Sequence, residues 1–248
     1  MERLRELLEL KEVDASSLAP LFDSGAGQVY CLTTGGAEAL GVWRALRTAL
    51  SGHGRWPVLL GDVSDLDRFA KAYAHESRSP REILDASSAI DPVVLLSRKR
   101  DVFGEEGFDE DEPEWEVEAV PNTTFTIPTD ILTGRPLERV TIALVPTDAP
   151  WEVPAYLKFG GWNECLEPEE HVALMRRWNE LYGAEVVGMT SAVVEMVVAR
   201  PPSDLGRAKA LAREQYVYCP DIVDQGTGTI AALAETLLDA PVWYFWWD

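Results

Sequence analysis

Short apolar runs alternate with segments of helical spacing through the first hundred residues, and this alternation restricts the possible folds most. Residues 28–33 and 57–62 have the composition of buried strands, and the segments 37–50 and 65–77 after them place apolar side chains every three or four residues. Two further short helices are expected, over 2–11 and 81–89. Strands that alternate with helices are typical of an α/β layer arrangement.

Three local features complete this part of the chain. Ser64 is expected to cap the helix over 65–77. Residues 92–97 are strand-like, although a helical interpretation stays open. The turn Thr34-Gly35-Gly36 lies between a strand and a helix, where a helix N-terminus can bind an anion. No lysine-containing phosphate-binding motif accompanies it, so a plain turn is the favoured interpretation.

The second part continues with a strand, a helix, a hairpin, two helices and a final strand. The first of these helices is expected from Pro168, which suits a first turn, to Gly183, a natural stop. Ser203 is expected to cap the next helix, and Thr227 or Thr229 the last one. The other ranges are a strand over 139–145, a partly extended aromatic segment over 151–160, a hairpin over 184–189 and 192–199, and a terminal aromatic strand over 243–247.

The predicted fold class is therefore α/β or α+β. It combines an N-terminal α/β layer with a C-terminal, split β-α-β-like antiparallel sheet and its helices. A stretch with four prolines and many acidic residues separates the two parts. We expect an N-terminal subdomain over 1–100, a linker or excursion over 101–137, and a C-terminal domain over 138–248.

Charge is the strongest compositional signal. The net charge is −20, from 22 basic and 42 acidic residues, and ten of the acids lie between residues 101 and 120 with no lysine or arginine. Such a surface repels phosphate backbones and anionic lipids, so we expect neither a nucleic-acid nor a membrane partner. The acidic stretch is interpreted as a solvated loop, and the alternative is a docking segment for a basic protein.

Cysteine usage and hydropathy indicate the compartment. Cys31, Cys165 and Cys219 are an odd set without tight spacing, which does not fit a disulfide framework. No run approaches the roughly 18 apolar residues of a membrane span, and the N-terminus is too charged for a signal peptide. A cytoplasmic location is expected.

The motifs of the second part occur together in an unusual order. They are Phe159-Gly160-Gly161-Trp162-Asn163-Glu164-Cys165, His171, Trp178, Tyr182-Gly183-Ala184-Glu185, Arg200-Pro201-Pro202, Glu214-Gln215-Tyr216, Tyr218-Cys219-Pro220-Asp221, Gln225-Gly226 and the terminal Trp243-Tyr244-Phe245-Trp246-Trp247-Asp248. With them, residues 150–248 or so resemble the bacterial domain of unknown function 4253 family. In that resemblance the first cysteine precedes a proline, whereas here Leu166 follows Cys165. The resemblance implies a C-terminal domain and no particular activity.

Two groups of residues are the candidate binding sites. The first is a polar loop between two helices together with the end of the helix before it, and its members are Glu214, Gln215, Cys219, Asp221, Asp224 and Gln225. Helix capping is the alternative role for these side chains. The second is an aromatic-rich surface for a partner, made of Trp151, Trp162 and Asn163. Packing of that loop back on the sheet is the alternative.

Sulfur and imidazole side chains raise the question of a metal site or a catalytic pair. Cys165, His171, Cys219 and Asp221 are suitable zinc ligands by type, but their spacing matches no known zinc motif. A Cys–His nucleophile would need a base in reach and an oxyanion site. We favour buried cysteines and a hydrogen-bonded core histidine, and we assign no catalytic residue, no metal ligand and no cofactor.

Three functions remain. The favoured one is a non-catalytic cytoplasmic interaction protein, immunity-like or regulatory, that binds a basic partner. The first alternative is a small-ligand or metal-binding domain that uses the loop from Cys219 to Gln225. The second is a hydrolase based on cysteine or carboxylate side chains.

Overall fold

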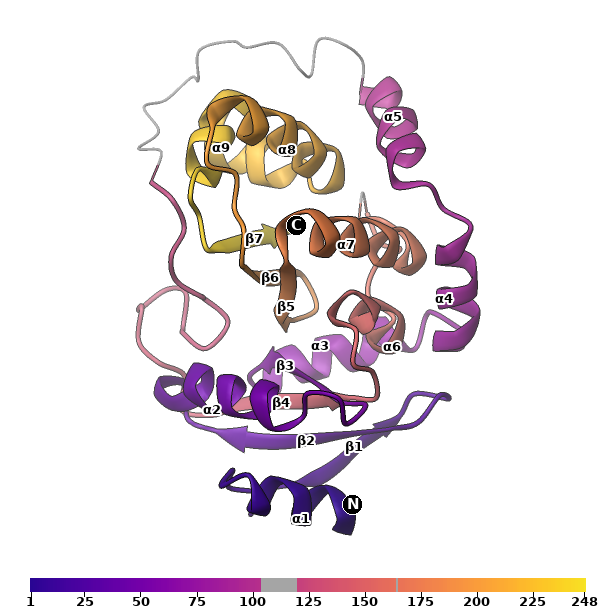
Figure 1. Ribbon diagram of the computed structural model, residues 1–248, viewed down its shortest axis with the longest axis vertical. Coiled ribbons are helices and arrows are strands. Elements are labelled where there is room, and N and C mark those ends of the chain that lie inside the picture. The colour runs from indigo at the N-terminus through magenta and orange to yellow at the C-terminus, as the bar shows by residue number, and fades with distance from the viewer. Residues whose placement is uncertain (104–119, 164) are drawn as a thin grey trace.

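A seven-stranded mixed sheet forms the centre of the computed structural model, which describes residues 1–103, 120–163 and 165–248 (Figure 1). The strands lie in the order β1-β2-β4-β3-β5-β6-β7. Their bounds are β1 (Ala19–Asp23), β2 (Gln28–Thr34), β3 (Trp56–Gly61), β4 (Val140–Val145), β5 (Ala184–Met189), β6 (Val193–Val198) and β7 (Val242–Trp246). Only β3 and β5 run parallel among these strands; the other neighbours are antiparallel. The predicted class, α/β or α+β, is confirmed.

The central strands are apolar because both faces of the sheet are covered there. Every residue of β3 and of β4 is buried. Helix α2 (Gly36–Ala49) packs against β3 and β4, α3 (Val63–Tyr73) against β3, and α7 (Pro168–Tyr182) against β5. Continuous apolar runs such as these are typical of strands covered on both sides.

The remaining helices extend the molecule along its long axis. Figure 1 shows α1 at one end of this axis, and α8 and α9, which pack on each other, at the opposite end. Their bounds are α1 (Glu2–Leu10), α4 (Pro80–Ser88), α5 (Pro92–Phe103), α6 (Val153–Leu157), α8 (Leu205–Tyr218) and α9 (Ile230–Leu237), with a 3₁₀ turn η2 (Pro150–Glu152) and a single π-helical turn η3 (Ile222–Thr227). No helix in the described part of the chain has the length and apolar character needed to cross a bilayer.

Residues at the helix ends explain most of the agreement between the predicted and the observed helix bounds. Helix α7 begins at Pro168 and ends at Gly183, whose left-handed conformation (φ 63°) stops it, as predicted. Thr229 caps α9 by accepting a hydrogen bond from the Ala232 N–H. Two predicted caps are wrong, because a nearby aspartate caps the helix and the predicted serine does not. These aspartates are Asp62 in place of Ser64 before α3, and Asp204 in place of Ser203 before α8.

Two segments adopt a different structure from the one expected. Residues 92–97 belong to helix α5, whose first N–H groups, from Val93 and Val94, bond the side chain of Asp91. Residues 151–160 are not extended: they form η2 and α6, and all five residues of α6 are buried. In both cases packing outweighs strand-like composition, and α5 has in addition the local cap from Asp91.

Strands from both predicted parts of the chain share the one sheet. The C-terminal strands β5, β6 and β7 pair antiparallel, as expected, but β4 pairs with β2 and β3 instead of joining them. Strand β3 lies between β4 and β5, with Leu59 opposite Gly188. The Trp56 indole N–H also donates to the Val186 carbonyl over 2.9 Å. The division at residues 100 and 137 stays a prediction, whereas the sheet is continuous across it.

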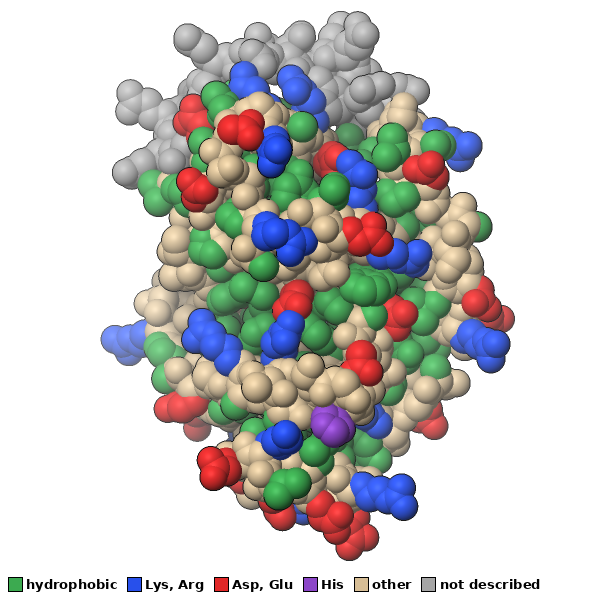
Figure 2. Space-filling view, in the orientation of Figure 1, with side chains coloured by type: hydrophobic (Ala, Val, Ile, Leu, Met, Phe, Trp, Pro, Cys, Tyr) green, Lys and Arg blue, Asp and Glu red, His purple; other side chains and the backbone are tan. Residues whose placement is uncertain are grey.

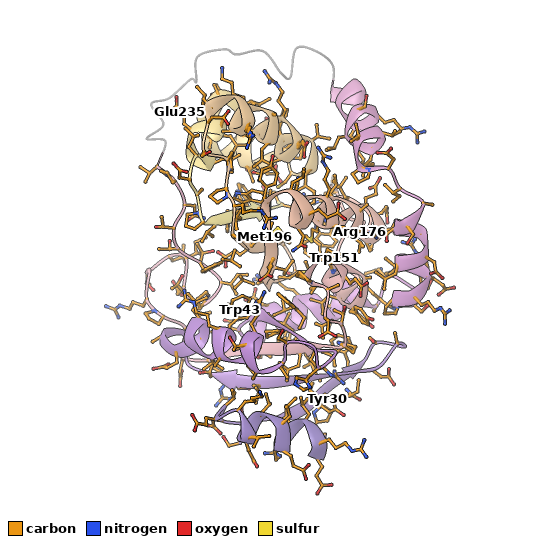
Figure 3. The ribbon with its side chains drawn as sticks, viewed as in Figure 1. Tyr30, Trp43, Trp151, Arg176, Met196 and Glu235 are labelled. Carbon is orange, nitrogen blue, oxygen red and sulfur yellow. The ribbon has the colours of Figure 1, made fainter. Side chains whose placement is uncertain are left out.

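The interior is filled mainly by aliphatic and aromatic side chains. Figure 3 shows Trp43 of α2 and Met196 of β6 inside the molecule, and Glu235 on the outer side of α9. The Trp43 indole N–H donates to the Pro57 carbonyl of β3 over 2.8 Å. A cluster of aromatic rings lies between α7, α8 and β7, where Trp178 stacks on Phe245.

Candidate functional site

A pocket of about 310 Å³ lies beside β7, the last strand of the sheet. We name it the β7 pocket. Helices α8 and α9, the η3 turn and β7 form its walls. The lining residues are Val120, Asn122, Gln215, Ile222, Gly226, Thr227, Leu233, Thr236, Leu237, Val242, Trp243, Tyr244 and Trp246. None of them carries a formal charge at neutral pH, which sets this pocket apart in a chain of net charge −20.

The turn between α8 and α9 forms one wall of the pocket. Helix α8 ends at Cys219, whose thiol donates to the Trp246 carbonyl over 3.0 Å and ties the turn to β7. The η3 turn follows, and Gly228 ends it in a left-handed conformation (φ 74°) that a side chain would strain. Single π-helical turns of this kind are frequent at functional sites.

Two buried hydrogen-bond donors of this pocket have no acceptor among the described residues. They are the amide nitrogen Nε2 of Gln215 and the indole nitrogen Nε1 of Trp243, whose side chains belong to residues that are each 1% exposed. Buried polar groups in native proteins are nearly always hydrogen-bonded, and leaving one unpaired costs about 1–3 kcal/mol. Both donors belong to residues that line the same pocket.

The backbone of β7 adds unpaired groups on the side of the strand that faces away from β6. The Val198 N–H donates to the Pro241 carbonyl, and the Trp247 N–H donates to the Ala192 carbonyl. Because hydrogen-bonding directions alternate along a strand, Tyr244 directs its N–H and carbonyl away from β6. Neither of these two groups has a partner among the described residues.

The predicted ligand residues divide between this pocket and other surroundings. Gln215 lines the pocket, whereas Glu214 beside it points to α7. There its carboxylate accepts from Arg177 Nη2 over 2.8 Å and from the Trp178 indole over 3.0 Å. Glu214 and Arg177 border a second groove of about 280 Å³ between α5, α7 and α8. Adjacent residues of one helix thus face two different sites.

The predicted loop residues hold the η3 turn in place. Asp221 accepts from Gln225 Nε2 over 2.9 Å and from the Asp248 N–H over 3.1 Å, so it fixes the C-terminus. Asp224 accepts from the Tyr216 hydroxyl over 3.1 Å, and burial raises its pKa. None of these three loop side chains lines the pocket; they support the turn that does.

The predicted partner residues lie in separate contacts. Trp151 is half-buried and lines a polar pocket with Arg47 and Glu185. Trp162 packs edge to face on Phe159, with ring centroids 4.9 Å apart. Asn163 is exposed, and its amide donates to the Asp248 carbonyl near the C-terminus. A partner surface made of these residues stays a prediction.

A fully buried histidine connects Cys165 and Tyr218. His171 Nε2 lies 3.3 Å from the Cys165 sulfur, and Nδ1 lies 2.8 Å from the Tyr218 hydroxyl oxygen. Burial lowers the pKa of His171 to about 3 and raises the pKa of the Cys165 thiol. A neutral imidazole next to a protonated thiol lacks the thiolate that nucleophilic catalysis needs.

The same surroundings do not assemble a metal site. No group of three or more histidine, cysteine, aspartate or glutamate side chains in the described ranges is placed to hold an ion. Asp221 is occupied by Gln225 and the chain terminus, and Cys219 by the Trp246 carbonyl.

The Thr34-Gly35-Gly36 turn leaves no room for an anion at the α2 N-terminus. The Gly36 N–H donates to the Leu137 carbonyl over 2.8 Å. A Cβ built on Gly36 would lie 2.3 Å from the Pro128 carbonyl oxygen. Backbone from residues 128–137 therefore occupies this position, and the plain turn is the correct interpretation.

The sequence placed Gln215 among the candidate ligand residues and did not indicate Trp243. Trp243 belongs to the terminal aromatic run, which indicates a buried strand and gives no sign that the strand ends the sheet. The pairing of an unpartnered glutamine with an unpartnered indole exists only in the folded chain, because residues 215 and 243 come from separate elements.

Residues 141–248 match the sequence model of the family described as Domain of unknown function (DUF4253). The resemblance predicted over about residues 150–248 is therefore confirmed. No curated protein and no solved structure matches the chain. The matched range contains β4 from its second residue, β5 to β7, α6 to α9 and all of the described β7 pocket residues except Val120 and Asn122.

Proposed function

We propose that this chain is a small-molecule-binding protein and that the β7 pocket is its site. The observation that carries the proposal is the pair of buried donors, Gln215 Nε2 and Trp243 Nε1, without acceptors. A ligand that brings an acceptor oxygen would remove two desolvation penalties of about 1–3 kcal/mol each. Small-molecule sites typically combine an apolar wall with a few convergent polar groups, as here.

Binding without catalysis fits this site better than hydrolysis. Burial raises the pKa of the Cys219 thiol to about 12. The thiol is also engaged with the Trp246 carbonyl. A hydrolase would need an activated nucleophile and a base within hydrogen-bond reach of each other.

The proposal is tested by following the indole N–H of Trp243 in a ¹⁵N–¹H spectrum. The chain has nine tryptophans, so a Trp243→Phe variant identifies the signal by its loss. A library of neutral, acidic and basic small molecules is then added one compound at a time. We expect a subset of compounds to shift the Trp243 signal and to raise the thermal unfolding midpoint.

A matched pair of variants shows whether the pocket is the cause. Gln215→Leu removes one buried donor and is expected to weaken every hit. Gln28→Leu makes the same change in β2, toward the other edge of the sheet and outside the pocket, and is expected to leave the hits unchanged. A library that never moves the Trp243 signal, or hits that are indifferent to Gln215→Leu, would contradict the proposal.

A second candidate function is favoured by charge alone. A net charge of −20 supports binding of a basic protein by a non-catalytic interaction protein. Half of that charge lies in residues 101–120, and of these residues 104–119 are outside the described ranges. Figure 2 shows acidic and basic side chains of the described residues interspersed over the visible face.

The acidic stretch is tested with a basic probe. Binding of a ten-residue lysine peptide is measured for the full chain and for a variant whose acids between residues 105 and 118 are changed to amides. We expect the variant to lose most of the affinity, and the loss to shrink as salt is added, because salt screens exposed charges. Equal affinity of both proteins would argue against this function.

A further inference from the structure

We infer that the β7 pocket takes a small neutral carboxamide, such as an N-acetylated amino-acid amide with an aliphatic side chain; this inference rests on the function proposed above. Four features of the pocket indicate the ligand class: the absence of charge among its described lining residues, its buried donors, the edge of β7 that no described strand pairs with, and its apolar wall.

The first step concerns charge. Thirteen uncharged residues line the pocket, so a carboxylate or ammonium group inside it would lose hydration without gaining a counter-charge. Tyr244 is the only lining residue with an ionisable side chain, and burial raises the pKa of its phenol to about 12. The described residues that line the pocket therefore carry no charge throughout the physiological range, which favours a neutral ligand.

The second step concerns acceptors. Gln215 Nε2 and Trp243 Nε1 are both donors, so the ligand must present acceptor oxygen to them. A carbonyl oxygen has two lone pairs and accepts two hydrogen bonds, which suits two donors that line one pocket. A hydrocarbon of the same size would leave both penalties in place.

The third step concerns the β7 edge. Tyr244 directs one N–H and one carbonyl away from β6, and four of the five β7 residues line the pocket. Of the common neutral groups, a secondary amide offers a donor and an acceptor with the geometry that a strand edge accepts. An amide thus matches the backbone of β7 as well as the side chains of Gln215 and Trp243.

The fourth step concerns the apolar wall. Ile222, Leu233, Leu237 and Val242 present aliphatic surface to the pocket. Burial of an aliphatic side group of the ligand against such a wall contributes about 25 cal/mol of favourable transfer free energy per Å². The pocket volume of about 310 Å³ limits the ligand to a small molecule.

The test compares four leucine derivatives by titration, with the Trp243 indole signal as the measure of binding. They are N-acetyl-L-leucinamide, the anionic N-acetyl-L-leucine, the cationic L-leucinamide and the neutral N-acetyl-L-leucine methyl ester. We expect the diamide to bind most tightly, with dissociation constants for the two ions at least about tenfold higher, since burial of an unpaired charge costs more than 1.4 kcal/mol. The ester lacks the terminal N–H donors and is expected to be intermediate.

Variants identify the groups that contact the amide. Gln215→Leu and Trp243→Phe are each expected to raise the dissociation constant of the diamide about fivefold, since a neutral hydrogen bond contributes about 1 kcal/mol. Isothermal titration calorimetry measures this constant for every variant, because Trp243→Phe lacks the indole signal. Gln28→Leu in β2 is the control and is expected to leave it unchanged. Unchanged helical circular dichroism and a cooperative thermal transition show that each variant is folded.

The outcomes separate the ligand class from the proposed function. If an ion binds as well as the diamide or better, the neutral-amide inference is overturned and the pocket remains a ligand site. If the diamide binds equally well to the Gln215→Leu and Trp243→Phe variants, the inference is overturned too. If neither these four compounds nor the mixed library shifts the Trp243 signal, both the inference and the proposed function fail.

Discussion

Burial determines the chemistry of His171. The side chain has no exposed surface, and its two ring nitrogens contact the Cys165 thiol and the Tyr218 hydroxyl. Both partners stay protonated at neutral pH, because burial raises the pKa of the thiol and of the phenol. The lowered pKa of His171 therefore follows from lost hydration, and Lys99 nearby adds to it.

We predict that His171 makes the fold sensitive to acid. Its pKa is about 3 in the folded chain and 6.5 in the reference state, so the unfolded chain binds the proton more readily. The stability from the neutral imidazole is complete above pH 6.5 and is lost as the pH falls below it, by up to about 1.4 kcal/mol per pH unit. Urea unfolding between pH 7.5 and 5 measures this, with His171→Phe as the comparison. The free energy of unfolding should fall more steeply for the natural chain, and parallel slopes would contradict the prediction.

We predict that Glu195 holds the segment around Thr126 on the sheet. Its buried carboxylate accepts from the N–H and hydroxyl of Thr126 with one oxygen and from the Ile127 N–H with the other. In Glu195→Gln one of these oxygens becomes an NH₂ group that faces a donor, so stability should fall by about 1–3 kcal/mol. Chemical unfolding at pH 7 measures the loss. Glu185→Gln is the control: its partner Arg47 is partly exposed, and this change should cost less than about 1 kcal/mol.

At the scale of elements, close contacts between backbones determine where helices begin. The first residue of α2 is Gly36, which lies against the backbone of Pro128 and Leu137. Gly41 lies on the exposed side of the same helix with nothing within 4 Å of a Cβ built on it. The two glycines therefore differ in their surroundings while they share one helix.

We predict opposite effects of alanine at these two positions. Gly36→Ala would push the backbone of residues 128–137 off the helix and should destabilise the fold by about 1–3 kcal/mol. Gly41→Ala adds a good helix former without a clash and should stabilise it by up to about 1 kcal/mol. Thermal and urea unfolding of both variants measure the difference. Destabilisation of the same size at both positions would show that the backbone contact at Gly36 is unimportant.

How well the sequence predicted an element depends on how local its cause is. Helix α7 was predicted to both ends, because Pro168 and Gly183 act within one turn of themselves. Helix α5 was not distinguished from a strand, because Val93 and Val94 favour strands and the contacts with α7 and α8 that decide the matter come from elsewhere in the chain. No local residue pattern of this kind predicts the η3 turn.

At the scale of the whole molecule, β3 links the two ends of the sheet. It pairs with β4 on one side and with β5 on the other, and it is buried throughout. The family match over residues 141–248 starts at β4 and does not include β3. The residues matched by the family model therefore include the strands β4 and β5 but not β3, which lies between them.

We predict that residues 138–248 do not fold alone. Without β3, the buried edges of β4 and β5 would have no partners, and unpaired backbone groups in a core cost free energy. This fragment should give a poorly dispersed ¹H–¹⁵N spectrum and no cooperative urea transition, whereas the full chain unfolds in one transition. A dispersed spectrum and a cooperative transition for the fragment would contradict this prediction.

The candidate site was predictable only in part, because it depends on contacts between distant parts of the chain. The sequence indicated a polar turn before the last helix and included Gln215, which lines the pocket. It could not indicate Trp243, because the pocket depends on which strand ends the sheet, and strand order is not a local property. Polar residues such as Asp221 and Gln225 look alike in a sequence whether they bind a ligand or stabilise a turn.

The position of β3 also bears on how the chain is made. A ribosome releases β3 long before β5, since Leu59 precedes its partner Gly188 by more than half the length of the chain. During that interval one edge of an entirely apolar strand is open, and such edges pair readily with other chains. Nascent chains of this protein should therefore depend on chaperones until synthesis has passed β5, and slow translation of residues 62–188 should lower the soluble yield.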